Sequence, residues 1–226
     1  MKLSTNNEYR CRVDLDLYSS PACEGLATQA AAGRYLQIES LTPTAQALPI
    51  RSREDNYPAW LKLADVEHLE LTTDLYKFVE IERPTIAASI PKVIAFMQAA
   101  MAVPNHYLWG GTVAPNYDCS GLMQAAFGSQ GIWLPRDSYQ QEAFVEPVSI
   151  EQMLPGDLIF FGTPEKTDHV ALHLGELRYI HSSGIQMGRN GIGIDILTDR
   201  TTDPVSAGYY AKFRCCGRIM NSYSGR

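Results

Sequence analysis

Cys119 lies in the short segment Asp118-Cys119-Ser120-Gly121, and two histidines, His169 and His181, follow it later in the chain. A thiol is a weak nucleophile at its usual pKa of roughly 8.5, and it becomes a thiolate at a helix N-terminus or beside a protonated histidine. One cysteine and two histidines therefore predict a cysteine hydrolase, with His169 as the base and His181 as the residue that orients its ring.

The residues around Cys119 predict the helix that would activate it. Asp118 is of a type that caps helix N-termini, apolar residues continue through Leu122 and Ala126, and Gly128 can end the helix. Cys119 would then lie in the first turn. There the unpaired N–H groups and the positive end of the helix dipole stabilise a thiolate, and also the oxyanion that forms after attack on a carbonyl.

Two runs of alternating polarity, residues 168–174 and 178–182, predict a β-hairpin that would bring the histidines together. Gly175 breaks the pattern between them. A turn centred on this glycine would place His169 opposite His181, because each lies six residues from it. Directly opposite residues have Cβ atoms roughly 4.5–5.5 Å apart, which suits one imidazole holding another.

Six ordered segments of this region resemble the NlpC-type cell-wall cysteine peptidases, which have a papain-like core. The segments are 107–111, 118–122, 134–138, 155–161, 169–172 and 179–182. The resemblance covers about residues 90 to 216. It implies a catalytic triad of Cys119, His169 and His181, with Tyr107 near the oxyanion. It also implies an α+β fold in which the helix bearing the cysteine packs on an antiparallel sheet bearing the histidines.

The residues before this core predict a small β-rich domain. Strict alternation from Tyr9 to Leu17 predicts one half-buried strand. Turn signals such as Ser19-Ser20-Pro21 and Asp55-Asn56-Tyr57-Pro58 separate further short apolar pieces. The pattern resembles a bacterial SH3-like β-barrel.

A helix is expected to open the second domain at Pro91, because proline suits a first helical turn. Its apolar face would consist of Val93, Ile94, Phe96, Met97, Ala100 and Met101. Residues 74 to 84 would form a packed connection before it. We therefore expect two domains, a barrel over residues 1–84 and a cysteine peptidase domain over residues 85–226.

Composition narrows the class of protein. The 226 residues, 45% of them hydrophobic, are enough for one or two domains with sizeable cores. A formal net charge of −6 argues against nucleic acid or an anionic membrane as a partner. Five cysteines, two of them adjacent, do not form a typical disulfide framework. No spacing typical of metal ligands is present, and we expect no cofactor.

The first residues, Met1 to Glu8, turn polar at once and lack the apolar core of a signal peptide. No run approaches ~20 consecutive apolar residues, the length that crosses a membrane. We therefore expect a cytoplasmic protein.

The resemblance also implies a substrate. Family members hydrolyse wall stem peptides, commonly between γ-linked D-glutamate and a diamino acid such as diaminopimelate. A cytoplasmic member with a leading barrel resembles the enzymes that recycle peptides with a free N-terminal L-Ala. Asp118, Ser138 and a barrel tyrosine would form the amine pocket, with Tyr57 best placed by its motif and Glu24 as a further barrel candidate. The expected substrate-binding residues are Tyr57, Tyr107, Asp118, Ser120, Arg136, Asp137 and Ser138.

Two carboxylates in this set have a second interpretation, because Asp118 and Asp137 both precede predicted helices and can serve as N-caps. Two other functions also stay open. The same core could be an amidase or acyltransferase of lipids or small amides, which the lack of an amine pocket would favour. It could also be a wall-binding module with an inert core, against which the intact Cys119, His169 and His181 argue.

Overall fold

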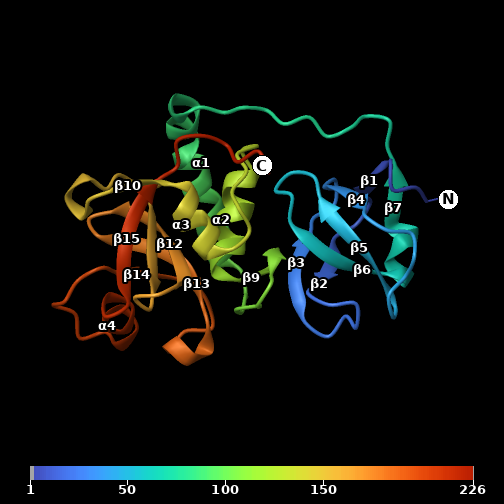
Figure 1. Cartoon of the computed structure of the whole chain (residues 1–226). Coiled ribbons are helices and arrows are strands. Elements are labelled where there is room, and N and C mark those ends of the chain that lie inside the picture. Colours follow the sequence, from blue (N-terminus) through green and yellow to red (C-terminus); the bar gives the residue numbers. More distant parts are fainter. Residues whose placement is uncertain (1–2, 226) are drawn as a thin grey trace.

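The computed structural model describes residues 3–225 as two domains side by side, joined by an extended segment (Figure 1). The N-terminal domain is an antiparallel seven-stranded sheet in the order β3-β2-β6-β5-β4-β1-β7. Its elements are β1 (Glu8–Cys11), β2 (Leu15–Tyr18), β3 (Leu26–Ala30), β4 (Tyr35–Ile38), β5 (Ala47–Ser52), β6 (Pro58–Lys62), the 3-10 helix η1 (Leu63–His68) and β7 (Leu69–Leu71). Inward side chains such as Leu17, Leu36 and Ile50 form a separate buried core.

The strand predicted from Tyr9 to Leu17 is two strands, β1 and β2. The chain bends between them, where the Arg12 N–H donates to the His68 carbonyl at 2.9 Å. Val13 at this bend is exposed, whereas the other alternate residues are buried. The predicted faces are correct and the predicted single strand is wrong, because a contact with a distant segment interrupts it.

The C-terminal domain is built on an antiparallel six-stranded sheet in the order β10-β15-β11-β12-β13-β14. Its strands are β10 (Glu146–Val148), β11 (Leu158–Gly162), β12 (Thr167–Gly175), β13 (Arg178–Ser183), β14 (Gly191–Ile196) and β15 (Phe213–Arg218). Its helices are α1 (Arg83–Ala102), α2 (Cys119–Gly128), α3 (Ser138–Phe144) and α4 (Pro204–Tyr210). Shorter elements are β8 (Thr112–Val113), β9 (Asn116–Tyr117), η2 (Ile150–Gln152) and η3 (Ile185–Met187).

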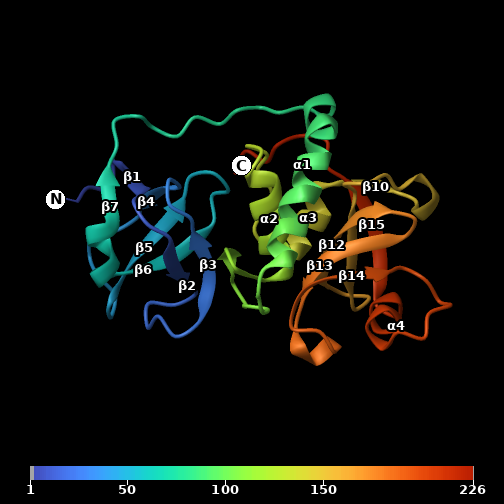
Figure 2. The same ribbon diagram turned by 180° about the vertical axis from the view of Figure 1, so that it is seen from behind.

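The helices cover both faces of this sheet. α1, α2 and α3 lie between the sheet and the N-terminal domain in both views (Figures 1 and 2). Leu122 and Phe127 of α2 share a buried core with Val170 and Leu172 of β12. α4 packs on the opposite face. The predicted arrangement, a helix bearing the cysteine on a sheet bearing the histidines, is therefore confirmed.

The helix predicted to begin at Pro91 begins at Arg83. Pro84 occupies its first turn, where the missing N–H costs nothing, and Pro91 lies inside the helix on its exposed side. Ile86 and Ile90 extend the buried stripe on the N-terminal side of Pro91. Packing of this stripe stabilises the helix, so it continues past Pro91. The predicted start is wrong because either proline fits a first turn.

α1 has the length and apolar composition of a helix that could cross a membrane. A core helix of a globular domain passes the same test. Val93 and Met97 are buried in the core that α1 shares with α2, and Ile94 and Phe96 pack against it. The sequence was expected to hold no segment long and apolar enough to cross a membrane, and α1 is one. Its buried stripe places it in the core of the C-terminal domain.

The segment between the domains is mostly exposed, so the packed connection predicted for residues 74 to 84 is wrong except around Tyr76. The first sheet ends at Leu71 and α1 begins at Arg83. Within this stretch the Tyr76 N–H donates to Glu8 Oε2 at 2.7 Å, and the Tyr76 ring lies 5.9 Å from the ring of Tyr35. The exact domain boundary, predicted after residue 84, stays a prediction.

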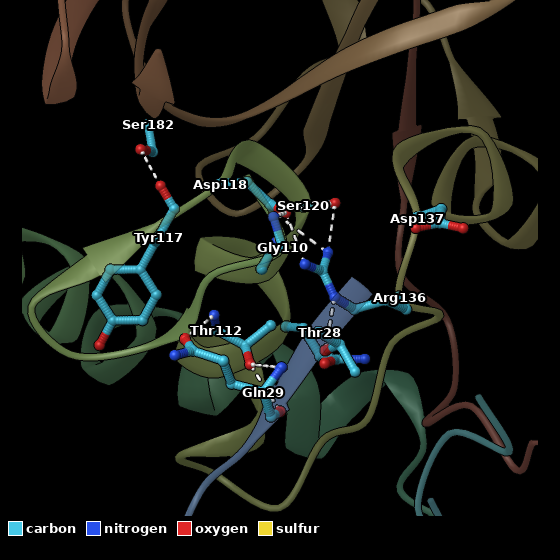
Figure 3. Close-up of polar contacts among 12 residues, drawn as sticks. Thr28, Gln29, Gly110, Thr112, Tyr117, Asp118, Ser120, Arg136, Asp137 and Ser182 are labelled. Carbon is cyan, nitrogen blue, oxygen red and sulfur yellow. Dashed lines mark hydrogen bonds and ion pairs between the residues drawn. The ribbon is translucent and has the colours of Figure 1, made fainter. Parts of the chain in front are cut away.

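Polar contacts, some buried and some partly buried, connect β3 of the N-terminal domain to the C-terminal domain (Figure 3). Gln29 Oε1 accepts from the Thr112 N–H at 3.0 Å, and Thr112 Oγ1 donates to the Gln29 carbonyl at 2.8 Å. Arg136 Nε donates to Thr28 Oγ1 at 2.9 Å, where both residues are buried. Hydrogen bonds shielded from water are costly to break, so these contacts hold the domains in one arrangement.

Candidate active site

α2 presents Cys119 in its first turn, as predicted. Asp118 is the N-cap residue, and its carboxylate accepts a hydrogen bond from the Gly121 N–H at 2.6 Å. Burial and the nearby Asp118 charge raise the pKa of Cys119 to about 12, although the N–H groups of Val170 and Ser120 oppose the shift. The resting thiol is therefore protonated at neutral pH, and a base must remove its proton during attack.

The predicted hairpin forms from β12 and β13, but its register differs from the prediction. The turn lies at residues 176–177, which have positive φ angles of 52° and 60°. Leu172 pairs with Ile180, so His169 is not directly opposite His181. The predicted register is wrong by two residues, because a two-residue turn replaces the turn expected around the glycine.

The two imidazoles nevertheless meet, since diagonal neighbours on one face of a sheet are within reach of long side chains. His169 Nε2 and His181 Nδ1 are 2.7 Å apart, and His181 Nε2 lies 2.6 Å from Asp195 Oδ2. Burial and the neighbouring His181 lower the pKa of His169 well below its usual value. His169 is therefore neutral at pH 7 and can accept a proton.

Three features place the histidine and the thiol in one site. The Val170 N–H that approaches the Cys119 thiol belongs to the residue after His169, so the chain itself places base and nucleophile together. Tyr107 lines the same cleft as Cys119, and burial together with the nearby Cys119 raises the pKa of Tyr107. The Tyr209 ring of α4 lies 4.5 Å from the His169 ring. Aromatic side chains thus flank both reacting groups.

Asp195 on β14 is a site residue that sequence reasoning missed. The signal available was the alternating run Gly191-Ile192-Gly193-Ile194-Asp195-Ile196, which is typical of a strand. In the structure β14 pairs with β13, and Gly193 lies opposite His181. Which residue Asp195 faces depends on the registers of two successive hairpins, and the sequence pattern does not fix them.

Cys119 opens into a cleft of about 540 Å³ between the domains. The N-terminal domain lines it with Ser19, Gly25, Leu26, Ala27 and Tyr57. The C-terminal domain contributes Tyr107, Trp109, Asp118, Cys119, Arg136, Asp137, Ser138, Tyr139, Lys166, Thr167 and Asp168. The Trp109 side chain is exposed at this cleft. The N-terminal domain therefore supplies one wall of the site.

Asp118 and Arg136 form a buried ion pair beside the cleft (Figure 3). Arg136 Nη1 and Nη2 lie 3.1 Å and 2.6 Å from Asp118 Oδ1 and Oδ2. The same carboxylate accepts from the N–H groups of Gly110 and Gly121 and from the Ser120 hydroxyl. These donors already fill the roughly four lone-pair positions of a carboxylate. The predicted cap role of Asp118 is confirmed, whereas its expected contact with a substrate ammonium does not fit this geometry.

Asp137 keeps acceptor positions open toward the cleft. It is the N-cap residue of α3, as predicted, and Gln140 Oε1 accepts from its backbone N–H at 3.1 Å. The Tyr57 hydroxyl lies 3.4 Å from each of its carboxylate oxygens. Burial raises the pKa of Asp137, although the charge of Arg136 opposes the shift. Its side chain is set apart from that of Asp118 (Figure 3) and lines the cleft.

The other expected substrate-binding residues divide into two groups. Ser138 lines the cleft beside Asp137. The Ser120 hydroxyl instead accepts from Arg136 Nη1 at 3.0 Å and is buried, so it supports the ion pair and does not face the cleft. Glu24 is exposed, and the cleft lining in residues 3–225 does not include it.

Comparisons with known proteins give relatives for part of the chain. Dipeptidyl-peptidase 6 of Lysinibacillus sphaericus is 34% identical over 106 residues, which cover 46% of this chain and 36% of that protein. The gamma-D-glutamyl-L-lysine dipeptidyl-peptidase of Bacillus subtilis (strain 168) is 37% identical over 95 residues, which cover 41% of this chain and 30% of that protein. The match thus spans about a third of the length of these curated relatives.

A solved structure covers almost the whole chain. The crystal structure of an NlpC/P60 family protein from Bacillus cereus ATCC 10987 superposes with a TM-score of 0.52 at 22% identity. The superposition covers 96% of this chain and 64% of that one. At this identity the likeness shows the fold alone.

Sequence profiles assign both domains. The profile of the bacterial dipeptidyl-peptidase SH3 domain matches residues 17–66, which confirms the predicted SH3-like domain. The NlpC/P60 profile matches residues 104–218, just over half of the chain. The protein therefore belongs to the NlpC/P60 family of peptidoglycan hydrolases, which are cysteine peptidases in type.

Proposed function

We propose that this protein is a cysteine endopeptidase that cleaves the bond between γ-linked D-glutamate and a diamino acid, such as meso-diaminopimelate, in stem peptides with a free N-terminal L-Ala. The observation that carries the proposal is Asp137, a partly buried carboxylate with open acceptor positions beside Tyr57. It lies in a cleft that the N-terminal domain walls on one side. The name of one relative, a gamma-D-glutamyl-L-lysine dipeptidyl-peptidase, supports a bond between γ-D-glutamate and a diamino acid, and the name of another, dipeptidyl-peptidase 6, supports release of a dipeptide.

The charges in the cleft match those of the substrate. A free N-terminal ammonium requires an acidic acceptor when it leaves water, and Asp137 provides one with the Tyr57 hydroxyl beside it. The α-carboxylate of D-glutamate requires a cation. Lys166 lines the cleft, with its ammonium 5.2 Å from the centre of the Tyr139 ring, and Tyr139 and Asp137 line the same cleft. An acidic and a basic side chain in the lining of one cleft suit the two charges of L-Ala-γ-D-Glu.

The mechanism follows from the geometry of the reacting groups. Cys119 Sγ attacks the γ-carbonyl carbon while His169 takes the thiol proton. Backbone N–H groups at the start of α2, with the Tyr107 hydroxyl nearby, stabilise the oxyanion. The protonated His169 then gives its proton to the leaving amine, and a thioester on Cys119 remains. Water, deprotonated by His169, hydrolyses that thioester and restores the thiol, while His181 holds the ring.

A requirement for a free L-Ala amine would restrict the enzyme to peptides already released from the glycan strands. We therefore include in the proposal a cytoplasmic role in recycling such peptides. Fractionation of cells that express the tagged protein would test the location. Recovery of the protein in the wall or culture medium would contradict it.

The catalytic proposal is tested by mass spectrometry of L-Ala-γ-D-Glu-meso-diaminopimelate after incubation with the enzyme, beside the same peptide with an acetylated N-terminus. Release of L-Ala-γ-D-Glu from the free peptide alone is the expected result. Cleavage of both peptides would indicate a wall hydrolase that does not need the amine. Cleavage of neither would favour an amidase or acyltransferase, and a wall-binding module with an inert core would react with no acyl substrate at all.

A further inference from the structure

The pair of histidines ends on a carboxylate whose two oxygens have different partners. Asp195 Oδ2 lies 2.6 Å from His181 Nε2. Asp195 Oδ1 lies 2.5 Å from Arg189 Nη2 and accepts from Ser206 Oγ at 3.4 Å. Burial alone would raise the pKa of Asp195, but the hydrogen bond to His181 and the charge of Arg189 hold it below its usual value. Asp195 is therefore ionised, and each oxygen has a fixed task.

An ionised carboxylate can only accept hydrogen bonds, and this fixes the proton on each ring. His181 must carry its proton on Nε2 in order to donate to Asp195, so its Nδ1 keeps a lone pair. That lone pair can accept from His169 only when His169 carries its proton on Nε2. The Nδ1 atom of His169 is then the unprotonated nitrogen, available as the base for Cys119.

Arg189 determines which oxygen of Asp195 faces the histidine. Its guanidinium packs across Gly193, the residue opposite His181 on β14, so closely that a Cβ atom there would lie 2.3 Å from Nη1. Arg189 Nε has no hydrogen-bond partner among the described residues. The ion pair with Asp195 and the glycine surface therefore hold this side chain in place.

We propose that Asp195, anchored by Arg189, is a positioning residue that sets the tautomers of both histidines and thereby makes His169 Nδ1 the general base. The inference rests on the proposed function only in taking Cys119 as the nucleophile, and it does not depend on which peptide is cleaved. The cleft lining in the described part of the chain does not include Asp195, so Asp195 acts through His181. It also stabilises the imidazolium that forms on His169 during attack.

The test is Asp195→Asn, and Arg189 makes its outcome specific. Arg189 and Ser206 both donate to the Oδ1 position, so the Asn carbonyl must take that position and the NH2 group must face His181. His181 then accepts on Nε2 and carries its proton on Nδ1, which forces His169 to carry its proton on Nδ1 as well. We expect long-range ¹H–¹⁵N spectra to show both rings reversed. We expect alkylation of Cys119 by iodoacetamide to slow about 10²–10⁴-fold, as when a comparable orienting carboxylate is replaced in a serine protease triad.

Asp203→Asn is the matched control. Asp203 caps α4 by accepting from the Ser206 N–H at 2.7 Å, and asparagine caps helices equally well. This variant should keep the wild-type tautomers and the wild-type alkylation rate. Wild-type tautomers and rate in Asp195→Asn would overturn the proposal. So would a wild-type spectrum with the His181 proton on Nδ1, a measurement that needs no variant. Fast alkylation of a wild-type protein that cleaves no peptide would contradict the proposed function and leave this inference standing.

Discussion

Two sides of the active site satisfy their polar groups in opposite ways: the sheet wall, which is the buried group His169, His181 and Asp195 behind the cleft, and the interface wall, which is Asp137 and Tyr57 in the cleft lining. On the sheet side, His169, His181 and Asp195 are buried and joined by contacts of 2.7 Å and 2.6 Å within one domain. On the domain-interface side, Asp137 and Tyr57 are only partly buried and meet at 3.4 Å. In the sheet wall, His169, His181 and Asp195 already pair with one another. In the interface wall, the Asp137 carboxylate has hydrogen-bond acceptor positions open to a ligand. In the proposed function the chemistry is thus built into one sheet, whereas recognition is assembled between two domains.

The largest effect should come from Cys119→Ala, which removes the nucleophile that His169 would activate. We expect cleavage to fall by at least about 10⁴-fold, because removing a nucleophile leaves only binding and oxyanion stabilisation. Stability should change by no more than about 1 kcal/mol, since a small side chain replaces another small one. Initial rates by mass spectrometry, with circular dichroism as the check on folding, measure both. If turnover persists in this variant, Cys119 is not the nucleophile, and the sheet wall is not the part of the site that carries out the reaction.

The next largest effect is on the free energy of unfolding, and it comes from the buried ion pair between Asp118 and Arg136. Arg136→Met leaves the Asp118 carboxylate buried without its cation, which should cost about 3–5 kcal/mol in the free energy of unfolding. The double variant Arg136→Met with Asp118→Asn should recover part of that loss, because no buried charge remains unpaired. Urea denaturation of the single and double variants measures the difference. A single variant as stable as the wild type would show that Asp118 is not committed to Arg136 and is free to bind a substrate.

A smaller and selective effect is expected from Asp137→Asn. A hydrogen bond to a charged group contributes about 1.5–3 kcal/mol, so kcat/KM for the free-amine peptide should fall roughly 10- to 100-fold. Asparagine keeps the N-cap of α3, so stability should hold. Asp168→Asn is the matched control, because Asp168 lines the same cleft with its carboxylate 3.9 Å from Lys212. Equal losses in the two variants would show a general charge effect and not an ammonium site.

The contrast between the walls also explains what the sequence could reveal. Cys119 and its helix were predictable because the cap and the apolar stripe are local signals. The pairing of His169 with His181 followed from two alternating strands, but the register did not, because the turn conformation decides it. Asp195 was missed because its contact depends on a third strand that lies beyond both hairpin turns.

On the interface wall, the sequence identified the candidate residues but not which of them would bind the substrate ammonium. Asp118 and Asp137 are both carboxylates before a helix, and sequence alone gave no reason to prefer either as the ammonium acceptor. The structure separates them, because Gly110 and Arg136 come from other segments and saturate Asp118. Tyr57 approaches Asp137 from a different domain, and a resemblance between motifs can suggest such a contact without giving its geometry.

The smallest expected effect, about tenfold between pH 7 and pH 9, is the dependence of kcat/KM on pH. The thiol cannot cause an alkaline decline there, since burial raises the pKa of Cys119 to about 12. The L-Ala amine, with a usual pKa of roughly 7.7–8.0, loses its charge in this range, and the uncharged amine binds Asp137 less well. On the acid side, burial lowers the pKa of His169, so the neutral base persists below pH ~6.5 and is lost only as pH falls through that lowered value. Rates of wild type and Asp137→Asn from pH 5 to 10 test this. An alkaline decline that is unchanged in Asp137→Asn would place it elsewhere than at the ammonium, and the interface wall would lose its role in recognition.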